Sequence, residues 1–233
     1  MPPTTGRWNR IVAITRLTTG LILFFYVLTH SLNHALGLVS LSAMEAGRQV
    51  FLGFWRFGPM GPLLLLAALL HLAIGLRAIY RRKSLRMPFL EATQLVLGLS
   101  APPLLMVHIF GTAGSHHLYG VDDRYVFVLW AIWVVTPALG IMQSAALVVT
   151  WVHGCIGLNY WLRIKPWFPR WRTFFGALAL LIPVLSLLGF VSGARDVARL
   201  APSTPTSSRP WRRRSICRVW RKSLSSVVSA TSS

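Results

Sequence analysis

Long apolar runs separated by short polar segments occupy most of the chain. Four of these runs are each close to the length of a helix that crosses a bilayer core of about 30 Å. They lie at residues 17–39, 62–80, 88–111 and 174–193. A further apolar run, residues 125–162, is longer than one crossing requires. We divide it into an interfacial or re-entrant piece and a spanning helix at residues 139–162. The pattern predicts an all-α, polytopic membrane helix bundle of about five transmembrane helices.

Positive charge predicts the orientation of this bundle. The chain has 24 Lys and Arg against 5 Asp and Glu, a formal net charge of +19. These basic residues flank the apolar runs or crowd residues 202–233, a distribution that favours membrane topology over nucleic-acid binding. Arg7, Arg10 and Arg16 precede the first run. Because basic residues collect on the cytoplasmic side, we expect residues 1–16 to be a cytoplasmic amino terminus.

The segments between and after the apolar runs are predicted to lack regular structure. Residues 40–61 and 112–124 are connecting loops in this interpretation, and His116 and His117 in the second loop are solvated rather than ligating. Residues 196–233 follow the last run and are basic, and most of this segment is rich in Ser, Thr and Pro. Such a composition offers little apolar surface to bury, so we expect a disordered tail.

Four histidines lie within the apolar runs, one in each of four predicted helices: His30, His71, His108 and His153. An imidazole in hydrocarbon is costly unless its nitrogens find partners, so an ionisable residue in a membrane helix marks a functional site by default. Two haem groups with two axial histidines each use all four side chains. His34 shares a helical face with His30 and is the alternative ligand.

Two other interpretations of the histidines stay open from the sequence. Each side chain can instead form a hydrogen bond that joins neighbouring helices, as polar residues do in membrane proteins. His30 and His34, four residues apart, can also form a small metal site, although no carboxylate or thiolate accompanies them.

Depth along the predicted helices sorts the histidines into two pairs. At 1.5 Å per residue, His71 and His153 lie near the middle of the membrane or slightly inside it, whereas His30 and His108 lie in the outer half. Haem held by two histidines has no open position for oxygen, so the expected role is electron transfer between the two levels. Glycines that could let a flat macrocycle approach lie one helical turn after four histidines: Gly37, Gly75, Gly111 and Gly157.

No catalytic centre is visible in the chain, because the acidic residues all lie in predicted loops or at helix ends: Glu45, Glu91, Asp122, Asp123 and Asp196. Neither a nucleophile–base pair nor a phosphate-binding loop is apparent. Arg86, Glu91 and Gln94 lie at the cytoplasmic end of the third long helix and are candidates for a quinone pocket. They also fit a plain interfacial cap.

The histidine segments resemble those of the dihaem cytochrome b anchors of succinate:quinone oxidoreductases and fumarate reductases. FYVLTHSLNHALGL is similar to the first-helix motif of that family, and LLHLAIGL, MVHIFGT and VHGCIGL are similar to the other three ligand segments. The resemblance covers about residues 10–195. It implies a dihaem domain at residues 17–195 that exchanges electrons with a quinone, with haem iron held by His30 and His108 at the outer level and by His71 and His153 at the inner level.

A closer resemblance is to the membrane anchors of redox-regulated bacterial class III adenylate cyclases. NHALGL, LRMPFLEATQ, WVHGCIGLNYWLR and GARDVARLA are similar to that subgroup. Its members continue with a sixth helix, a ferredoxin-type iron–sulfur domain and a cyclase domain, whereas the resemblance here stops after Ala201. We hypothesise that residues 202–233 are a truncated or frameshifted end. The resemblance implies the bacterial inner membrane and a homodimer.

Three functions therefore follow as expectations. The first is a redox-sensing dihaem anchor of an adenylate cyclase, which uses the quinone pool as its redox partner. The second is the cytochrome b subunit of a succinate dehydrogenase or fumarate reductase. The third is a haem-free structural anchor or transporter whose histidines only join helices.

Overall fold

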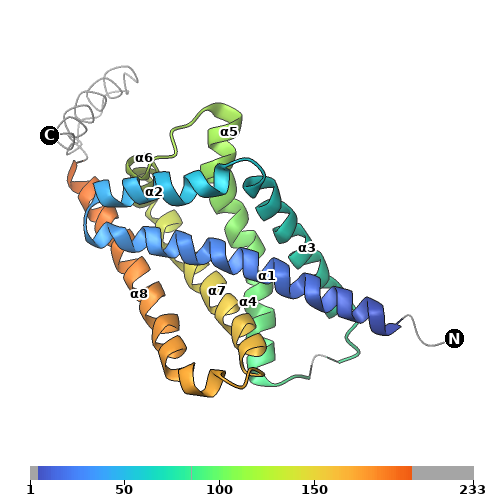
Figure 1. Ribbon diagram of the computed structural model, residues 1–233. Helices are drawn as coiled ribbons and strands as arrows, with labels where there is room; N and C mark the ends of the chain where they lie inside the picture. The colour runs from blue at the N-terminus through green and yellow to red at the C-terminus, as the bar shows by residue number, and fades with distance from the viewer. Residues whose placement is uncertain (1–4, 85, 201–233) are drawn as a thin grey trace. The chain divides into compact units, whose positions relative to one another are not determined.

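All regular secondary structure in residues 5–84 and 86–200, which the computed structural model describes, is helical. Figure 1 shows the course of the chain. The helices are α1 Thr5–Ala35, η1 Leu36–Leu38, α2 Leu41–Arg56, α3 Met60–Tyr80, α4 Phe89–Ile109, η2 Phe110–Gly114, α5 Ser115–Tyr119, α6 Tyr125–Leu129, η3 Trp130–Val135, α7 Pro137–Leu162 and α8 Phe168–Leu200. Five helices are long and apolar enough to cross a membrane, so the chain is an all-α membrane bundle. The described residues up to Ala198 form one compact unit.

The division of residues 125–162 is confirmed in outline. Tyr125–Val135 is a short apolar helix, and the spanning helix α7 begins at Pro137. Proline suits the first turn of a helix because its missing amide proton would have no partner there. α1 begins twelve residues before the predicted first helix, at Thr5. α8 extends the predicted fifth helix at both ends, so residues 196–200 are helical rather than part of a tail. The remaining tail residues lie outside the described ranges.

The prediction that residues 40–61 form a loop is wrong, because α2 occupies most of this segment. The Ser40 hydroxyl accepts a hydrogen bond from the Ala43 amide at 3.0 Å, which caps the start of α2. Met44, Gly47 and Trp55 are buried on one face of the helix. A search for continuous apolar runs misses such a helix, since its apolar residues recur at helical spacing among polar ones.

The predicted loop at residues 112–124 is likewise shorter than expected. α4 continues through the π-helical segment η2 into α5, which ends at Tyr119. Gly120 then adopts a positive φ of 64°, the left-handed conformation that commonly ends a helix. Only the remainder of the segment connects α5 to α6.

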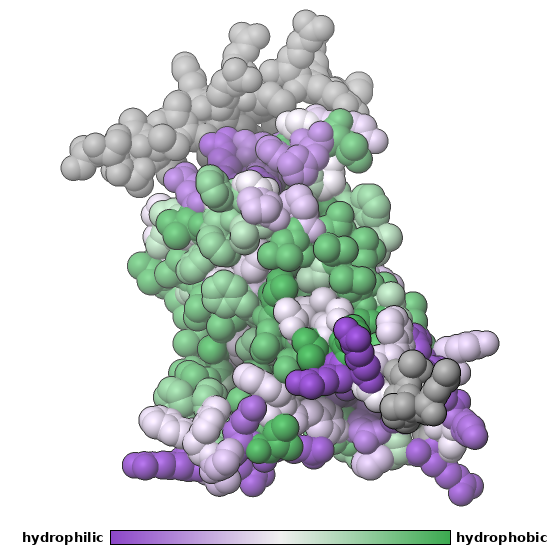
Figure 2. Space-filling model, turned by 45° about the vertical axis from the view of Figure 1, so that its right-hand side comes forward, coloured by the Kyte–Doolittle hydropathy of each residue, from purple (hydrophilic) through white to green (hydrophobic). Residues whose placement is uncertain are grey.

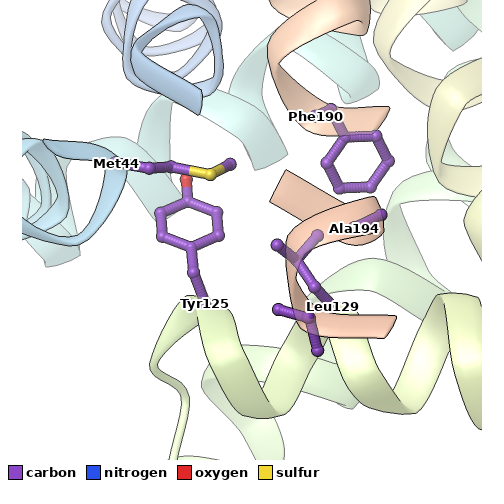
Figure 3. Packing of buried hydrophobic residues seen from close by; sticks show 6 residues of the cluster. Met44, Tyr125, Leu129, Phe190 and Ala194 are labelled. Atoms are coloured by element: carbon purple, nitrogen blue, oxygen red, sulfur yellow. The ribbon is translucent and has the colours of Figure 1, made fainter. Parts of the chain in front are cut away.

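The buried apolar core lies where α2, α6 and α8 meet (Figure 3). Met44 from α2 and Leu129 from α6 are fully buried, as is Val197 from α8. Phe190 of α8 and Tyr125 of α6 complete the cluster, together with Ala194. Figure 3 shows the Met44 side chain beside the Tyr125 ring, with Phe190 and Ala194 projecting from α8.

Hydrophobic side chains form a band between two hydrophilic ends on the face seen in Figure 2. We call one end the basic end, because most of the described Lys and Arg residues lie there with a single described acid, Glu91. These residues are Arg7, Arg10, Arg16, Arg77, Arg81, Arg82, Lys83, Arg86, Arg163, Lys165, Arg170 and Arg172. The opposite, mixed-charge end has described acids and bases in similar number. Glu45, Arg48, Arg56, Asp122, Asp123, Arg124, Arg195, Asp196 and Arg199 lie there.

Candidate functional site

The four intramembrane histidines lie inside a four-helix arrangement in which α1 packs along α3 and α4 packs along α7. His30 is on α1, His71 on α3, His108 on α4 and His153 on α7. The ring centroids of His71 and His153 are 6.3 Å apart, with the ring planes at 90°. Those of His30 and His108 are 5.8 Å apart at 67°. The structure therefore brings together the two pairs that the depth estimate predicted.

Each histidine of the inner pair uses Nδ1 for a hydrogen bond to a neighbouring helix. His153 Nδ1 lies 3.0 Å from the backbone carbonyl oxygen of Gln94, which only accepts, so Nδ1 must carry the proton. His71 Nδ1 lies 3.1 Å from Thr19 Oγ1. That hydroxyl also lies 2.7 Å from the backbone oxygen of Thr15 and 3.2 Å from that of Arg16, so its one proton has three acceptors within reach. The contact with Gln94 assigns His153 the tautomer whose Nε2 has a free lone pair, and the contact with Thr19 is compatible with the same tautomer for His71.

This arrangement of hydrogen bonds is the one seen around metal-bound histidines. A ligating imidazole usually donates its other N–H to a carbonyl, carboxylate or water, which fixes the tautomer and the ring orientation. The Gln94 carbonyl and the Thr19 hydroxyl occupy these positions for His153 and His71. Neither partner was recognised from the sequence. The only signal for Thr19 was a polar residue near the start of an otherwise apolar run.

Two glycines on neighbouring helices allow the inner histidine rings to lie close to the backbone. A Cβ atom added at Gly20 of α1 would be 3.1 Å from His71 Cε1, and one added at Gly98 of α4 would be 2.8 Å from His153 Cε1. Both distances are shorter than ordinary carbon contacts. Glycine at these positions therefore gives each ring its space.

The glycines expected from the sequence have other surroundings. Nothing in the described residues lies within 4 Å of a Cβ atom added at Gly75 or Gly111. Gly157 lies beside the Gln94 side chain, and Gly37 meets the backbone of α8. The glycines that give the inner histidine rings their space, Gly20 and Gly98, are therefore different from those predicted to let a macrocycle approach.

The outer pair is crowded by a third histidine. The His34 ring lies 4.5 Å from that of His30 and is stacked on Phe190 of α8 at 4.9 Å. His34 is 7% exposed, and its Nδ1 finds no hydrogen-bond partner among the described residues. The His30 ring, in contrast, is within 5.8 Å of His108, which also interacts with the Gln143 side chain. These contacts favour His30 over His34 as the partner of His108.

The spacing of both pairs fits a metal held between two imidazoles. Bonds of about 2 Å from each nitrogen to a central metal place the two ring centroids about 6 Å apart. The observed 6.3 Å and 5.8 Å agree with that separation. Within residues 5–84 and 86–200, no three His, Cys, Asp or Glu side chains are grouped to hold a metal ion. The residues thus fit a two-histidine cofactor better than a small metal site at His30 and His34.

The three quinone candidates do not share one set of contacts. Glu91 accepts a hydrogen bond from Arg82 at 2.7 Å, and both side chains are more than a third exposed. The Gln94 side chain lies against Gly157 on α7. The Arg86 side chain is at the surface of the basic end. Glu91 therefore pairs with the arginine before α4, and no side-chain hydrogen bond caps the start of that helix.

At the mixed-charge end, ion pairs connect α2 to the segment before α6. Arg48 Nε lies 2.6 Å from Glu45 Oε1, Arg48 Nη1 lies 3.2 Å from Asp123 Oδ1, and Arg56 also pairs with Asp123. Glu45 Oε2 accepts the Tyr125 amide at 3.0 Å and thereby caps α6. These contacts connect α2 to the segment before α6.

The side chains flanking this network are held by local contacts. Burial raises the pKa of the Asp122 carboxyl, but the hydrogen bonds from Arg124 outweigh it, so the net shift is downward. His116 Nδ1 lies 2.9 Å from the Val121 carbonyl oxygen.

No protein-family model, curated protein or solved structure matches the chain.

Proposed function

We propose that this protein is a membrane-embedded dihaem cytochrome b that exchanges electrons with the quinone pool and serves as the redox-sensing anchor of an adenylate cyclase. The observation that supports it most directly is the inner pair. The ring centroids of His71 and His153 are 6.3 Å apart, and each Nδ1 lies within hydrogen-bond distance of an oxygen on another helix.

The chain's own residues have defined roles in this proposal. His71 and His153 hold one haem, and His30 and His108 hold the other. When bound, each haem supplies a one-electron redox centre whose two axial positions are both taken. Thr19 and the Gln94 carbonyl orient the inner imidazoles and raise their basicity as ligands. The histidines are half-buried in helices that are apolar enough to cross a membrane, so the bundle and the surrounding hydrocarbon together would keep water from the rings.

The membrane and partners in this proposal follow from charge and from the family resemblance. The basic end faces the cytoplasm of a bacterial inner membrane, because basic residues collect on that side. A homodimer and a cytoplasmic cyclase or ferredoxin-type domain are the expected partners. The runner-up is the cytochrome b subunit of a succinate dehydrogenase or fumarate reductase. Neighbouring genes for a flavoprotein and an iron–sulfur subunit favour the runner-up, whereas a downstream cyclase frame favours the sensor.

The test is an optical spectrum of the purified full chain, oxidised and then dithionite-reduced, with a haem-to-protein ratio. We expect two b-type haems per chain. Changing His71 to alanine removes one axial ligand, so the ratio should fall to about one. His117→Ala is the matched control, because His117 is exposed in the segment after α4 and should leave the ratio unchanged.

Two results would contradict the proposal. One is a colourless protein after expression with ample haem, which favours the haem-free structural anchor. The other is a His71→Ala variant that keeps two haems, which would show that the inner pair is not the ligand set.

A further inference from the structure

A groove of about 420 Å³ opens between α4, α7 and α8, next to the basic end. Its lining includes Leu90 of α4, Trp151, Cys155 and Asn159 of α7, and Ala179 and Leu180 of α8. The wall is almost wholly apolar, and Leu180 is 70% exposed at its edge. The Trp151 indole nitrogen donates to the Ala179 carbonyl at 2.8 Å, which joins α7 to α8 within the groove.

The length of the groove along α7 is close to the thickness of the hydrocarbon in one leaflet. Asn159 and Trp151 lie three and eleven residues from Leu162, the last residue of α7. At 1.5 Å per residue these positions are about 5 Å and about 17 Å from the basic end. One leaflet of a bilayer contains about 15 Å of hydrocarbon. The groove therefore extends through most of the leaflet at the basic end.

Two arginines stand one helical turn beyond the groove lining. Arg163, which caps the end of α7, follows Asn159 by four residues, and Arg172 of α8 precedes Gly176, another lining residue, by four. Residues four apart share a helix face, which places both arginines toward the mouth of the groove. Neither forms an ion pair with an acid among the described residues, and the Arg163 guanidinium lies over the Tyr160 ring, 4.5 Å from its centroid. Glu91, the acid at this end, is paired with Arg82.

We propose that this groove binds one acyl chain of an anionic phospholipid and that Arg163 and Arg172 bind its phosphate headgroup. The apolar wall accepts hydrocarbon, and guanidinium groups match phosphate oxygens in geometry and charge. Arg163 and Arg172 have no acid partner among the described residues, so they disfavour a zwitterionic headgroup, which carries its own positive charge. A quinone ring is a poorer occupant, because Cys155 and Asn159 are the only polar side chains of the lining. This lipid site does not depend on the haem proposal.

The first experiment is native mass spectrometry of the purified full chain in detergent, with phosphatidylglycerol or phosphatidylcholine of identical acyl chains. Each basic residue near an anionic headgroup contributes roughly fivefold in affinity, so Arg163→Gln with Arg172→Gln should weaken phosphatidylglycerol binding roughly 30-fold. Phosphatidylcholine binding should not change. Arg7→Gln with Arg10→Gln removes the same charge from the basic end of α1 and should retain phosphatidylglycerol.

A second variant tests the groove itself. A Cβ atom added at Gly176 meets nothing within 4 Å in the described residues, so Gly176→Leu should fold and should fill the groove. We expect it to lose the bound phosphatidylglycerol while keeping the thermal midpoint of the unaltered chain. Three results would overturn the proposal: equal binding of the two lipids by the unaltered chain, phosphatidylglycerol retained by Gly176→Leu, or displacement of phosphatidylglycerol by a short-chain quinone.

Discussion

At the scale of single residues, the buried imidazoles show how a membrane interior fixes the state of a side chain. Water is absent there, so a histidine nitrogen without a protein partner carries the full cost of desolvation. His71 and His153 each have Nδ1 within hydrogen-bond distance of an oxygen on another helix. The Gln94 carbonyl thus selects for His153 the tautomer whose Nε2 has a lone pair free to bind iron.

Thr19→Val should test the contribution of one such partner. The change keeps the shape of the side chain but removes the acceptor for His71 Nδ1. Loss of a partner of this kind lowers metal affinity by about 10-fold to 100-fold. We expect incomplete haem loading when haem is limiting, measured as the haem-to-protein ratio. Thr15→Val is the control, because the Thr15 hydroxyl bonds only to the Ile11 carbonyl one turn earlier. Equal loading of both variants would remove the assigned role of Thr19.

The sequence predicted the positions of the four histidines and their division into two pairs, because depth follows from counting residues along a helix. It did not predict the Thr19 hydroxyl or the Gln94 carbonyl as partners. Those contacts depend on the rotation of each helix about its axis, and that rotation is decided by packing against neighbours. The same reason explains why Gly20 and Gly98 were missed.

At the scale of helices, α8 crosses closely over the end of α1 and the following turn η1. A Cβ atom added at Gly189 would overlap the backbone of His34, and one added at Gly37 would overlap the backbone of Gly189. Glycine lets two helix backbones come this close, as small residues do at membrane helix interfaces. The crossing also places Phe190 flat against His34.

Gly189→Ala should therefore destabilise the bundle. The added methyl group meets backbone rather than a movable side chain, and overpacking of this kind costs about 1–3 kcal/mol. Thermal unfolding in detergent measures the loss. Gly176→Ala on the same helix is the control, because its added Cβ meets open space and alanine favours helix. A Gly189→Ala variant as stable as the control would show that α8 is free to shift.

The ion pairs of α2 predict a second difference in stability. Asp123 is 10% exposed and is paired with Arg48 and Arg56, so Asp123→Asn removes the acid that Arg56 pairs with and leaves Arg48 with Glu45 alone. We expect the free energy of unfolding to fall by about 2 kcal/mol, a value between those for exposed and buried ion pairs. Glu91→Gln breaks the exposed pair with Arg82 and should cost less than about 1 kcal/mol. Similar thermal midpoints for the two variants would contradict this ranking.

At the scale of the whole molecule, the five spanning helices were predictable because the bilayer sets their length and composition. α2 was not, since an interfacial helix is only half apolar and never forms a continuous apolar run. Its buried Met44, Gly47 and Trp55 recur at helical spacing, and a search for that period finds it. The parts of α1 and α8 that extend past the predicted helices were missed for a similar reason, because their polar residues interrupt the apolar pattern.

The distribution of charge predicts the topology of the molecule. In a background with Cys155 and Cys217 replaced by serine, we consider Gln49→Cys on α2 and Lys83→Cys between α3 and α4, both at exposed positions. A membrane-impermeant maleimide added to intact spheroplasts should label only Gln49→Cys, because the basic end is expected inside. Labelling of Lys83→Cys without permeabilisation would reverse the orientation.

The crossing of α1 and α8 also has a consequence for biosynthesis. α1 is translated well before α8, so the contact between Gly37 and Gly189 forms only after most of the described chain has been made. Until α8 is inserted, Met44 and Leu129 have no Val197 or Phe190 to cover them. A nascent chain stalled before α8 therefore presents an unfinished core, and quality-control proteases can distinguish it from the completed molecule.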